Sequence, residues 1–122
     1  MTQQTFIITA ASFGMLSVIF GAFGAHALKK ILSNDQLKSF ETGVKYQMYH
    51  AIVLLTLGMS SSTMNAAIYW CFTIGIILFS FSIYSLVLSD AKGKKLKILG
   101  PVTPLGGLLL VAGWILLLFQ FM

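Results

Sequence analysis

The stretch Gly21-Ala-Phe-Gly-Ala-His-Ala-Leu-Lys-Lys30 decides the fold, because it ends the first hydrophobic segment with small residues, one histidine and two lysines. The segment it closes, about residues 5–28, contains His26 as its only ionisable side chain. At 1.5 Å per residue it is roughly 35 Å long, enough to cross a hydrocarbon core of about 30 Å. Because lysines follow at once and no positive region precedes it, we predict a retained transmembrane helix and not a cleaved signal peptide.

The composition excludes a protein with a water-facing surface. Of the 122 residues, 57% are hydrophobic and only 9% are charged, whereas a soluble domain carries about 25% charged residues. The net charge of +5 comes from lysines beside hydrophobic spans, which indicates membrane lipids and not nucleic acid as the partner. Cys71 is the only cysteine, so neither an intrachain disulfide nor a cysteine-based metal site is expected.

Three more hydrophobic segments follow, at about residues 46–61, 66–88 and 104–121. We therefore predict an all-α integral membrane protein, a single four-transmembrane-helix bundle over residues 1–122. Ser33-Asn-Asp-Gln36 matches a capping box, and apolar residues recur at helical spacing after it. This pattern predicts a short amphipathic helix at the membrane interface between spans one and two. Span four is expected to begin with Thr103 as its N-cap, unless the helix starts earlier and is kinked at Pro101.

Lysines are distributed unevenly between the two ends of the predicted bundle. Residues 29–45 and 89–100 carry all the charged side chains, whereas the second connection and both terminal tails carry none. By the positive-inside rule, both lysine-rich loops are expected in the cytoplasm and both termini outside. Small residues in span one, among them Ser17, Gly21 and Ala25, favour close packing of another helix of the same chain, more than a dimer seam.

Seven polar side chains are expected at one depth near the inner membrane surface. They are His26, Gln47, His50, Ser80, Ser82, Tyr84 and Thr103. Polar groups inside a membrane are costly, and therefore they are candidates for a ligand site or a proton or ion path. The lipid headgroup, a quinone-like molecule and another small ligand remain open as occupants. The alternative is structural, because serines in membrane helices often bond to backbone carbonyls.

A second candidate site lies where span four begins. The preceding loop contributes Lys92, Lys94, Lys95 and Lys97. Free backbone N–H groups and the positive end of the helix dipole add to this charge, so an anionic lipid headgroup is the expected ligand. For Gly106 and Gly107, close helix packing is the competing explanation.

Catalytic and metal-binding patterns are missing from the sequence. Neither GxSxG nor HExxH occurs, and two histidines without a nearby carboxylate or thiolate make a poor metal site. We therefore expect no enzyme activity, no cofactor and no metal. The sequence favours a non-enzymatic protein that binds a lipid or a partner membrane protein. The alternative is a small channel or transporter, which would need a homo-oligomer because four helices leave little room for a pore.

Four motifs resemble one known family. They are Gly21-Ala-Phe-Gly-Ala-His-Ala-Leu28, Tyr46-Gln-Met-Tyr-His-Ala51, Leu78-Phe-Ser-Phe-Ser-Ile-Tyr84 and Thr103-Pro-Leu-Gly-Gly107 followed by Gly113-Trp114. Together they resemble the YwdK/YgdD-like family of small inner-membrane proteins, a domain of unknown function. The resemblance implies a bacterial plasma-membrane protein with four spans and implies no established activity. The family's third motif has glycine where this chain has Phe81, which puts close helix approach there in doubt.

Overall fold

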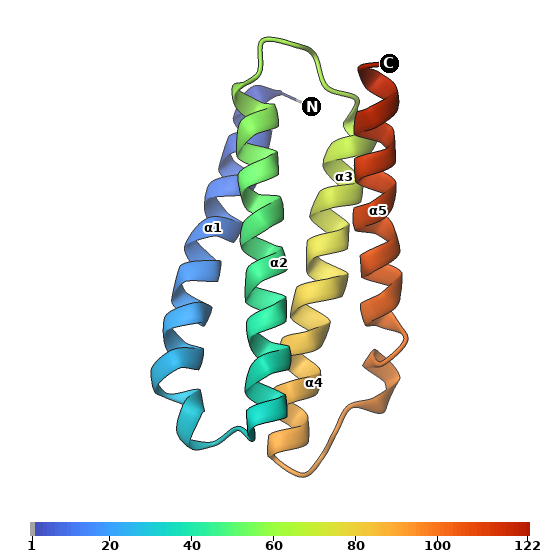
Figure 1. Cartoon of the computed structure of the whole chain (residues 1–122). Coiled ribbons are helices and arrows are strands. Elements are labelled where there is room, and N and C mark those ends of the chain that lie inside the picture. Colours follow the sequence, from blue (N-terminus) through green and yellow to red (C-terminus); the bar gives the residue numbers. More distant parts are fainter. Residues whose placement is uncertain (1) are drawn as a thin grey trace.

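The computed structural model describes residues 2–122, and all regular elements in that range are helical. In chain order they are α1 Gln3–His26, η1 Leu28–Lys30, α2 Asn34–Met59, α3 Ala66–Ile76, the π-helical turn η2 Ile77–Phe81, α4 Ser82–Ala91, η3 Lys97–Leu99 and α5 Val102–Gln120. Helices α1, α2, α3 with α4, and α5 lie side by side and alternate in direction (Figure 1). The segments α3, η2 and α4 form one column, and both termini lie at the same end (Figure 1).

Three of the four columns are long and apolar enough to cross a membrane: Gln3–Lys30, Ala66–Ala91 and Lys97–Gln120. The fourth, α2, has 26 residues and is equally long. It does not qualify on mean hydropathy, because Lys45, Gln47 and His50 lie near its middle, within the stretch that would span. The all-α fold is therefore confirmed. Three helices qualify as candidate spans by length and composition, so the predicted count of four is not confirmed.

The prediction of a separate interfacial helix between spans one and two is wrong. The structure instead has one uninterrupted helix from Asn34 to Met59. Its predicted start is confirmed, because the Ser33 Oγ accepts from the Gln36 N–H at 3.2 Å while the Gln36 side chain accepts from the Ser33 N–H at 2.9 Å. Buried positions recur every three or four residues through the expected break, so one helix face packs without interruption. They include Phe40, Gly43, Gln47, His50, Leu54 and Leu57.

Helix α5 begins earlier than the predicted N-cap at Thr103. Its first residue is Val102, and Pro101 occupies the N-cap position. Pro101 therefore precedes α5 and does not kink it. Pro104 fits the first turn because a helix does not need the N–H groups of that turn for its own hydrogen bonds.

Glycines set the closest approaches between helices. A β-carbon on Gly21 would lie 3.4 Å from Val44, and one on Gly24 would lie 3.1 Å from Phe40. The small-residue face of α1 therefore packs against α2 of the same chain, as predicted, although Ala25 is exposed. On the other side, a β-carbon on Gly106 would collide with the backbone of η2 at Phe79. Close packing at Gly106 is thus confirmed, and α5 touches the π-helical turn directly.

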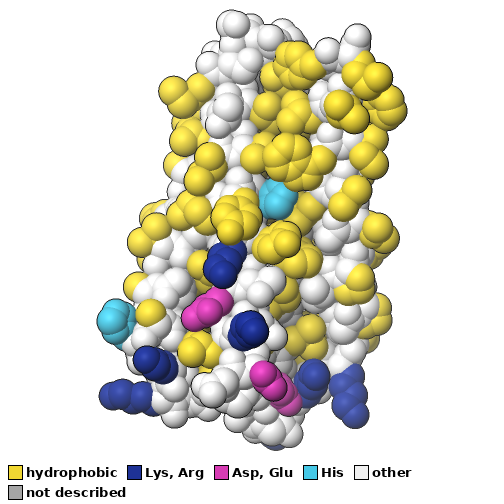
Figure 2. All heavy atoms as spheres, viewed as in Figure 1, with side chains coloured by type: hydrophobic (Ala, Val, Ile, Leu, Met, Phe, Trp, Pro, Cys, Tyr) yellow, Lys and Arg dark blue, Asp and Glu magenta, His cyan; other side chains and the backbone are white. Residues whose placement is uncertain are grey.

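The two ends of the molecule differ sharply in charge. Side chains of Lys, Asp and Glu gather at the lower end in Figure 2, and none is seen at the upper end. At the upper end, uncharged side chains hydrogen-bond to the connection between α2 and α3. Gln3 Nε2 donates to the Ser60 carbonyl at 2.7 Å, and Gln120 Nε2 donates to the Thr63 carbonyl at 3.1 Å. These contacts mark the end of the molecule that holds both termini.

Candidate functional site

The centre of the predicted polar layer is Gln47, whose side chain is fully buried. Its Nε2 donates to the Phe13 carbonyl at 2.8 Å, and its Oε1 accepts from the Tyr84 hydroxyl at 2.7 Å. Three helices are joined by this one amide: α1 through Phe13, α2 through Gln47 itself and α4 through Tyr84. Both the amino group and the carbonyl oxygen of this side-chain amide therefore have hydrogen-bond partners within the protein.

Ser80 lies beside this amide and bonds to the same helix. Its Oγ donates to the Gly43 carbonyl at 2.7 Å, and the serine is 1% exposed. Gly43 also makes room for the Tyr84 ring, since a β-carbon there would lie 2.8 Å from Tyr84 Cε1. Ser80 and Tyr84 are four residues apart, so they lie on the same face of this helical column and both reach α2. The π-helical turn ends between them, at Phe81.

Ser82 and Thr103 form a second, separate pair between α4 and α5. The Ser82 Oγ donates its only proton to the Phe79 carbonyl at 2.9 Å. The hydrogen bond between the Ser82 and Thr103 hydroxyls must therefore be donated by Thr103. This pair fixes the start of α5 against the π-helical turn and leaves Ser82 without a free proton.

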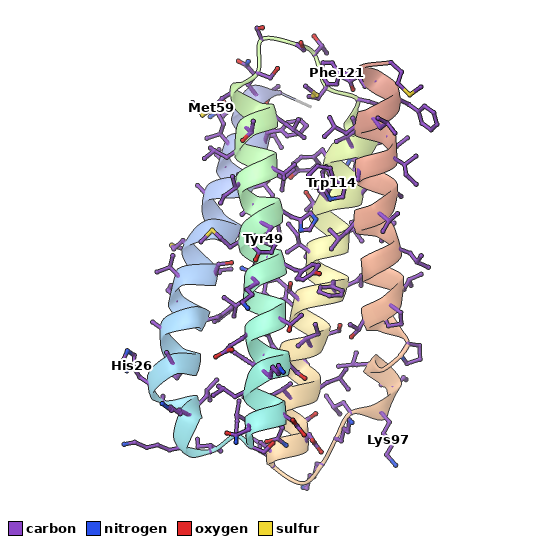
Figure 3. All side chains as sticks on the ribbon, viewed as in Figure 1. His26, Tyr49, Met59, Lys97, Trp114 and Phe121 are labelled. Atoms are coloured by element: carbon purple, nitrogen blue, oxygen red, sulfur yellow. The ribbon has the colours of Figure 1, made fainter. Side chains whose placement is uncertain are left out.

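His50 belongs to a third group, which joins α2 to α5. Its Nε2 accepts from the indole Nε1–H of Trp114 at 3.1 Å, while its Nδ1 lies 2.7 Å from the Tyr46 carbonyl. An indole can only donate and a carbonyl can only accept, so the imidazole is the neutral Nδ1–H form. Figure 3 shows Trp114 between α5 and α2. The candidate list from the sequence did not include Trp114, although a tryptophan far from either end of span four was the available signal.

His26 does not join the polar layer. It is the last residue of α1, its side chain is exposed, and Figure 3 shows it pointing away from the other helices. The structure therefore does not bring His26 together with the other six predicted site residues, because the side of α1 that carries Gly24 faces α2 instead. The remaining six residues form three hydrogen-bonded groups whose geometry holds helices together.

A hollow of about 470 Å³ lies at the lysine-rich end, between α2, α4 and the start of α5. Its lining residues are Asp35, Gln36, Ser39, Ile83, Leu86, Val87, Asp90, Lys95, Gly100, Thr103 and Pro104. This lining combines apolar side chains with charges of both signs. The Asp90 carboxylate accepts from Gln36 Nε2 at 2.9 Å, which ties α4 to the start of α2. Lys95 and Thr103 were predicted as site residues from the sequence, whereas Asp35 and Asp90 were not.

The four lysines predicted to bind a headgroup are all exposed, and one of them lines the hollow. Lys95 lines the hollow, whereas Lys92, Lys94 and Lys97 are exposed and do not line it. Lys97 lies at the lower end of the molecule in Figure 3. Within residues 2–122, His, Cys, Asp and Glu side chains form no group of three or more that could hold a metal ion.

Comparisons with known proteins agree on the family. A protein-family model described as "Protein of unknown function (DUF423)" matches residues 20–107 of this chain. A UPF0382 membrane protein of Staphylococcus haemolyticus is 41% identical over 121 residues, covering 97% of this chain and 95% of the relative. One from Staphylococcus aureus (strain bovine RF122 / ET3-1) is 42% identical over 119 residues, covering 95% of this chain and 93% of the relative.

A third relative, from Staphylococcus epidermidis, is 39% identical over 118 residues, covering 94% of this chain and 93% of the relative. No solved structure matches the chain. The relatives are named membrane proteins, which agrees with the apolar helices of the structure. The matched range contains His50, Gln47, Tyr84 and most of the charged hollow. On the strength of this match and these relatives, the chain belongs to the DUF423 family of membrane proteins of unknown function.

Proposed function

We propose that this protein crosses the membrane four times, catalyses no reaction and binds a phospholipid headgroup in the charged hollow. The count of four follows from the direction of the chain. Helix α1 ends at the lysine-rich end, and α3 begins at the opposite end (Figure 1). If α1 and the α3–α4 column both cross, the segment between them must return across the membrane, and α2 is that segment.

The orientation of the protein is argued from its charges. Every charged residue lies between Lys29 and Lys97, and the connection between α2 and α3 has none. By the positive-inside rule, the lysine-rich end faces the cytoplasm and both termini lie outside, in the plasma membrane of a bacterium. The hollow then lies at the depth of the inner-leaflet headgroups.

The lining of the hollow is the observation that carries the proposal. Asp35 and Asp90 provide negative charge, and Lys95 provides positive charge. A phospholipid whose headgroup contains both an ammonium and a phosphate, such as an ethanolamine phospholipid, can satisfy both signs. Its glycerol and upper acyl carbons would then contact Leu86 and Val87 on the apolar side.

The channel alternative receives less support from the core. The half of the core toward the termini is filled by apolar side chains of 0–2% exposure: Phe6, Leu54, Ile68, Phe72 and Ile76. Such packing leaves no polar path through one chain. The buried amide and Ser80 toward the lysine-rich end, and His50 nearer the middle, are also bonded to protein partners, as expected of a structural cluster.

Native mass spectrometry of protein released from nanodiscs of phosphatidylethanolamine and phosphatidylglycerol tests the proposal. Wild-type protein should retain phosphatidylethanolamine preferentially. Lys95→Gln and Asp90→Asn should each lower that retention several-fold, because each removes one charge from the hollow. Lys97→Gln is the matched control, since it removes the same charge from the same loop outside the hollow. Equal retention in Lys95→Gln and Lys97→Gln would contradict the assignment.

A further inference from the structure

The outward face of α2 is polar over the half of the helix that begins at Asn34. Thr42 is half-buried, and the other side chains of this face are exposed: Lys38, Glu41, Lys45, Tyr46 and Tyr49. Tyr46 and Tyr49 are 42% and 55% exposed. In Figure 2, charged side chains continue upward from the charged end over α2. We call this set, Lys38 to Tyr49 on the outer side of α2, the polar face.

The depth of the polar face follows from helix geometry. Helix α2 ends at Met59, next to Ser60, whose carbonyl accepts from the Gln3 side chain at the end of the molecule that holds both termini. At 1.5 Å per residue, Tyr49 is about 15 Å from that end and Lys45 about 21 Å. A hydrocarbon core of about 30 Å therefore places Tyr49 near its middle and Lys45 well inside it. Lys45 can reach toward the headgroups along the helix, but the Tyr49 hydroxyl cannot.

The other helices show what a lipid-facing surface looks like in this protein. The exposed residues of α1 in the corresponding region include Met15, Val18 and Ile19, and those of α5 include Leu108 and Val111. These faces are apolar, as hydrocarbon requires. Among these helices, α2 has a polar face at a similar depth. Exposing that face to lipid hydrocarbon would cost free energy. The contrast indicates that the polar face is covered by something other than lipid.

We infer that the polar face packs against the same face of a second copy of this chain, related by a two-fold axis along the membrane normal. The charges favour this partner, because the face carries Glu41 one helical turn from Lys45. In a parallel pair, Glu41 of each copy reaches Lys45 of the other, and both contacts form at once. The tyrosines lie deeper in the same seam, where their hydroxyls can bond across it. This inference does not rest on the proposed headgroup site, which lies on another side of α2.

Disulfide formation in native membranes tests the contact. In a Cys71→Ala background, which removes the one natural cysteine, Tyr49→Cys should give a disulfide-linked species of twice the monomer mass on mild oxidation. Val18→Cys on α1 is the control, because Val18 is 63% exposed and lies on an apolar face. Equal cross-linking at both positions, none at Tyr49→Cys, or a product of Tyr49→Cys with a different protein would each overturn the inference.

A charge exchange separates contacts between copies from contacts within one helix. Chains carrying Glu41→Lys alone or Lys45→Glu alone should each lose most of the self-association, because like charges would then face one another across the seam. When the two single variants are co-expressed with different tags, the mixed pair regains both attractions and should co-purify. Failure of the mixed pair to associate better than either variant alone would overturn the charge pairing. Its recovery also shows that both variants still fold.

Discussion

The indole N–H of Trp114 donates to His50 Nε2 at 3.1 Å, which joins two residues 64 positions apart in the chain. Because the other imidazole nitrogen donates to the Tyr46 carbonyl at 2.7 Å, both nitrogens of His50 are occupied. His50, one of the candidate site residues from the sequence, thus joins α2 to α5 through its hydrogen bonds. Protonation would place a second N–H against the indole donor, so the contact depends on neutral imidazole.

The first prediction concerns the tautomer of His50. In ¹⁵N-labelled protein in bilayers at neutral pH, solid-state NMR should show a neutral imidazole with the proton on Nδ1. His26 provides the internal comparison, because it is exposed at the end of α1. A dominant Nε2–H signal for His50 would contradict the hydrogen bond from Trp114.

The second prediction concerns the strength of the hydrogen bond between Trp114 and His50. Trp114→Phe removes the donor and should lower the free energy of unfolding by about 1 kcal/mol, as expected for a hydrogen bond between membrane helices together with some lost packing. Trp70→Phe is the matched control, because Trp70 is 48% exposed. Thermal unfolding in mild detergent measures both variants. An equal loss in the two would show that the Trp114–His50 bond contributes little.

The third prediction concerns the buried amide. Gln47→Leu removes the acceptor of the Tyr84 hydroxyl and should destabilise the protein by about 1–3 kcal/mol, because a buried hydroxyl loses its partner. Tyr84→Phe should cost less, since no hydroxyl is left behind. The double variant should be less destabilised than the sum of the two single losses, because it removes both partners. Additive losses in chemical unfolding would contradict the coupling.

The fourth prediction concerns the contact between α5 and the π-helical turn. Gly106→Ala should destabilise the protein by about 1–3 kcal/mol, because the added methyl group meets backbone atoms of Leu78 and Phe79 that cannot rotate away. Gly107→Ala is the control one residue later, where the nearest atom is 3.6 Å away on the Phe79 side chain. If the two alanines have the same effect on unfolding, the close approach at Gly106 is not as described.

The fifth prediction concerns orientation. In the Cys71→Ala background, a cysteine at Ser62 should react with a membrane-impermeant maleimide added to intact cells. A cysteine at Lys94 should react only after the cells are opened. The reason is that the lysine-rich loops are expected in the cytoplasm. The reverse labelling pattern would invert the proposed topology.

Much of the fold follows from local sequence rules. The Ser33–Gln36 capping box and the end of α1 near Lys29 involve residues a few positions apart, so their physics is local. The continuity of α2 was missed because the predicted break depended on a change in polarity at Lys45. Backbone hydrogen bonding does not respond to that change, and the buried face continues through it.

The candidate site was predicted less well, for a geometric reason. Depth in the membrane was counted along each predicted span, and the uninterrupted α2 changes that count, because it places His50 near the middle of the helix bundle while His26 ends α1. The direction of each side chain around its helix axis depends on packing against neighbours. That direction puts Gln47 and Tyr84 together, turns His26 outward and brings Asp35 close to Asp90 around one hollow.

The sequence by itself determined the membrane environment, the helical class, the uneven charge of the two ends and the small-residue faces that let helices approach. These properties depend on composition and on spacing along one helix. Only the tertiary structure decided which polar groups satisfy one another, since hydrogen bonds such as Trp114–His50 and Tyr84–Gln47 require both distance and angle between different helices. The same packing decided that the polar face of α2 points outward, where the protein's own helices do not cover it.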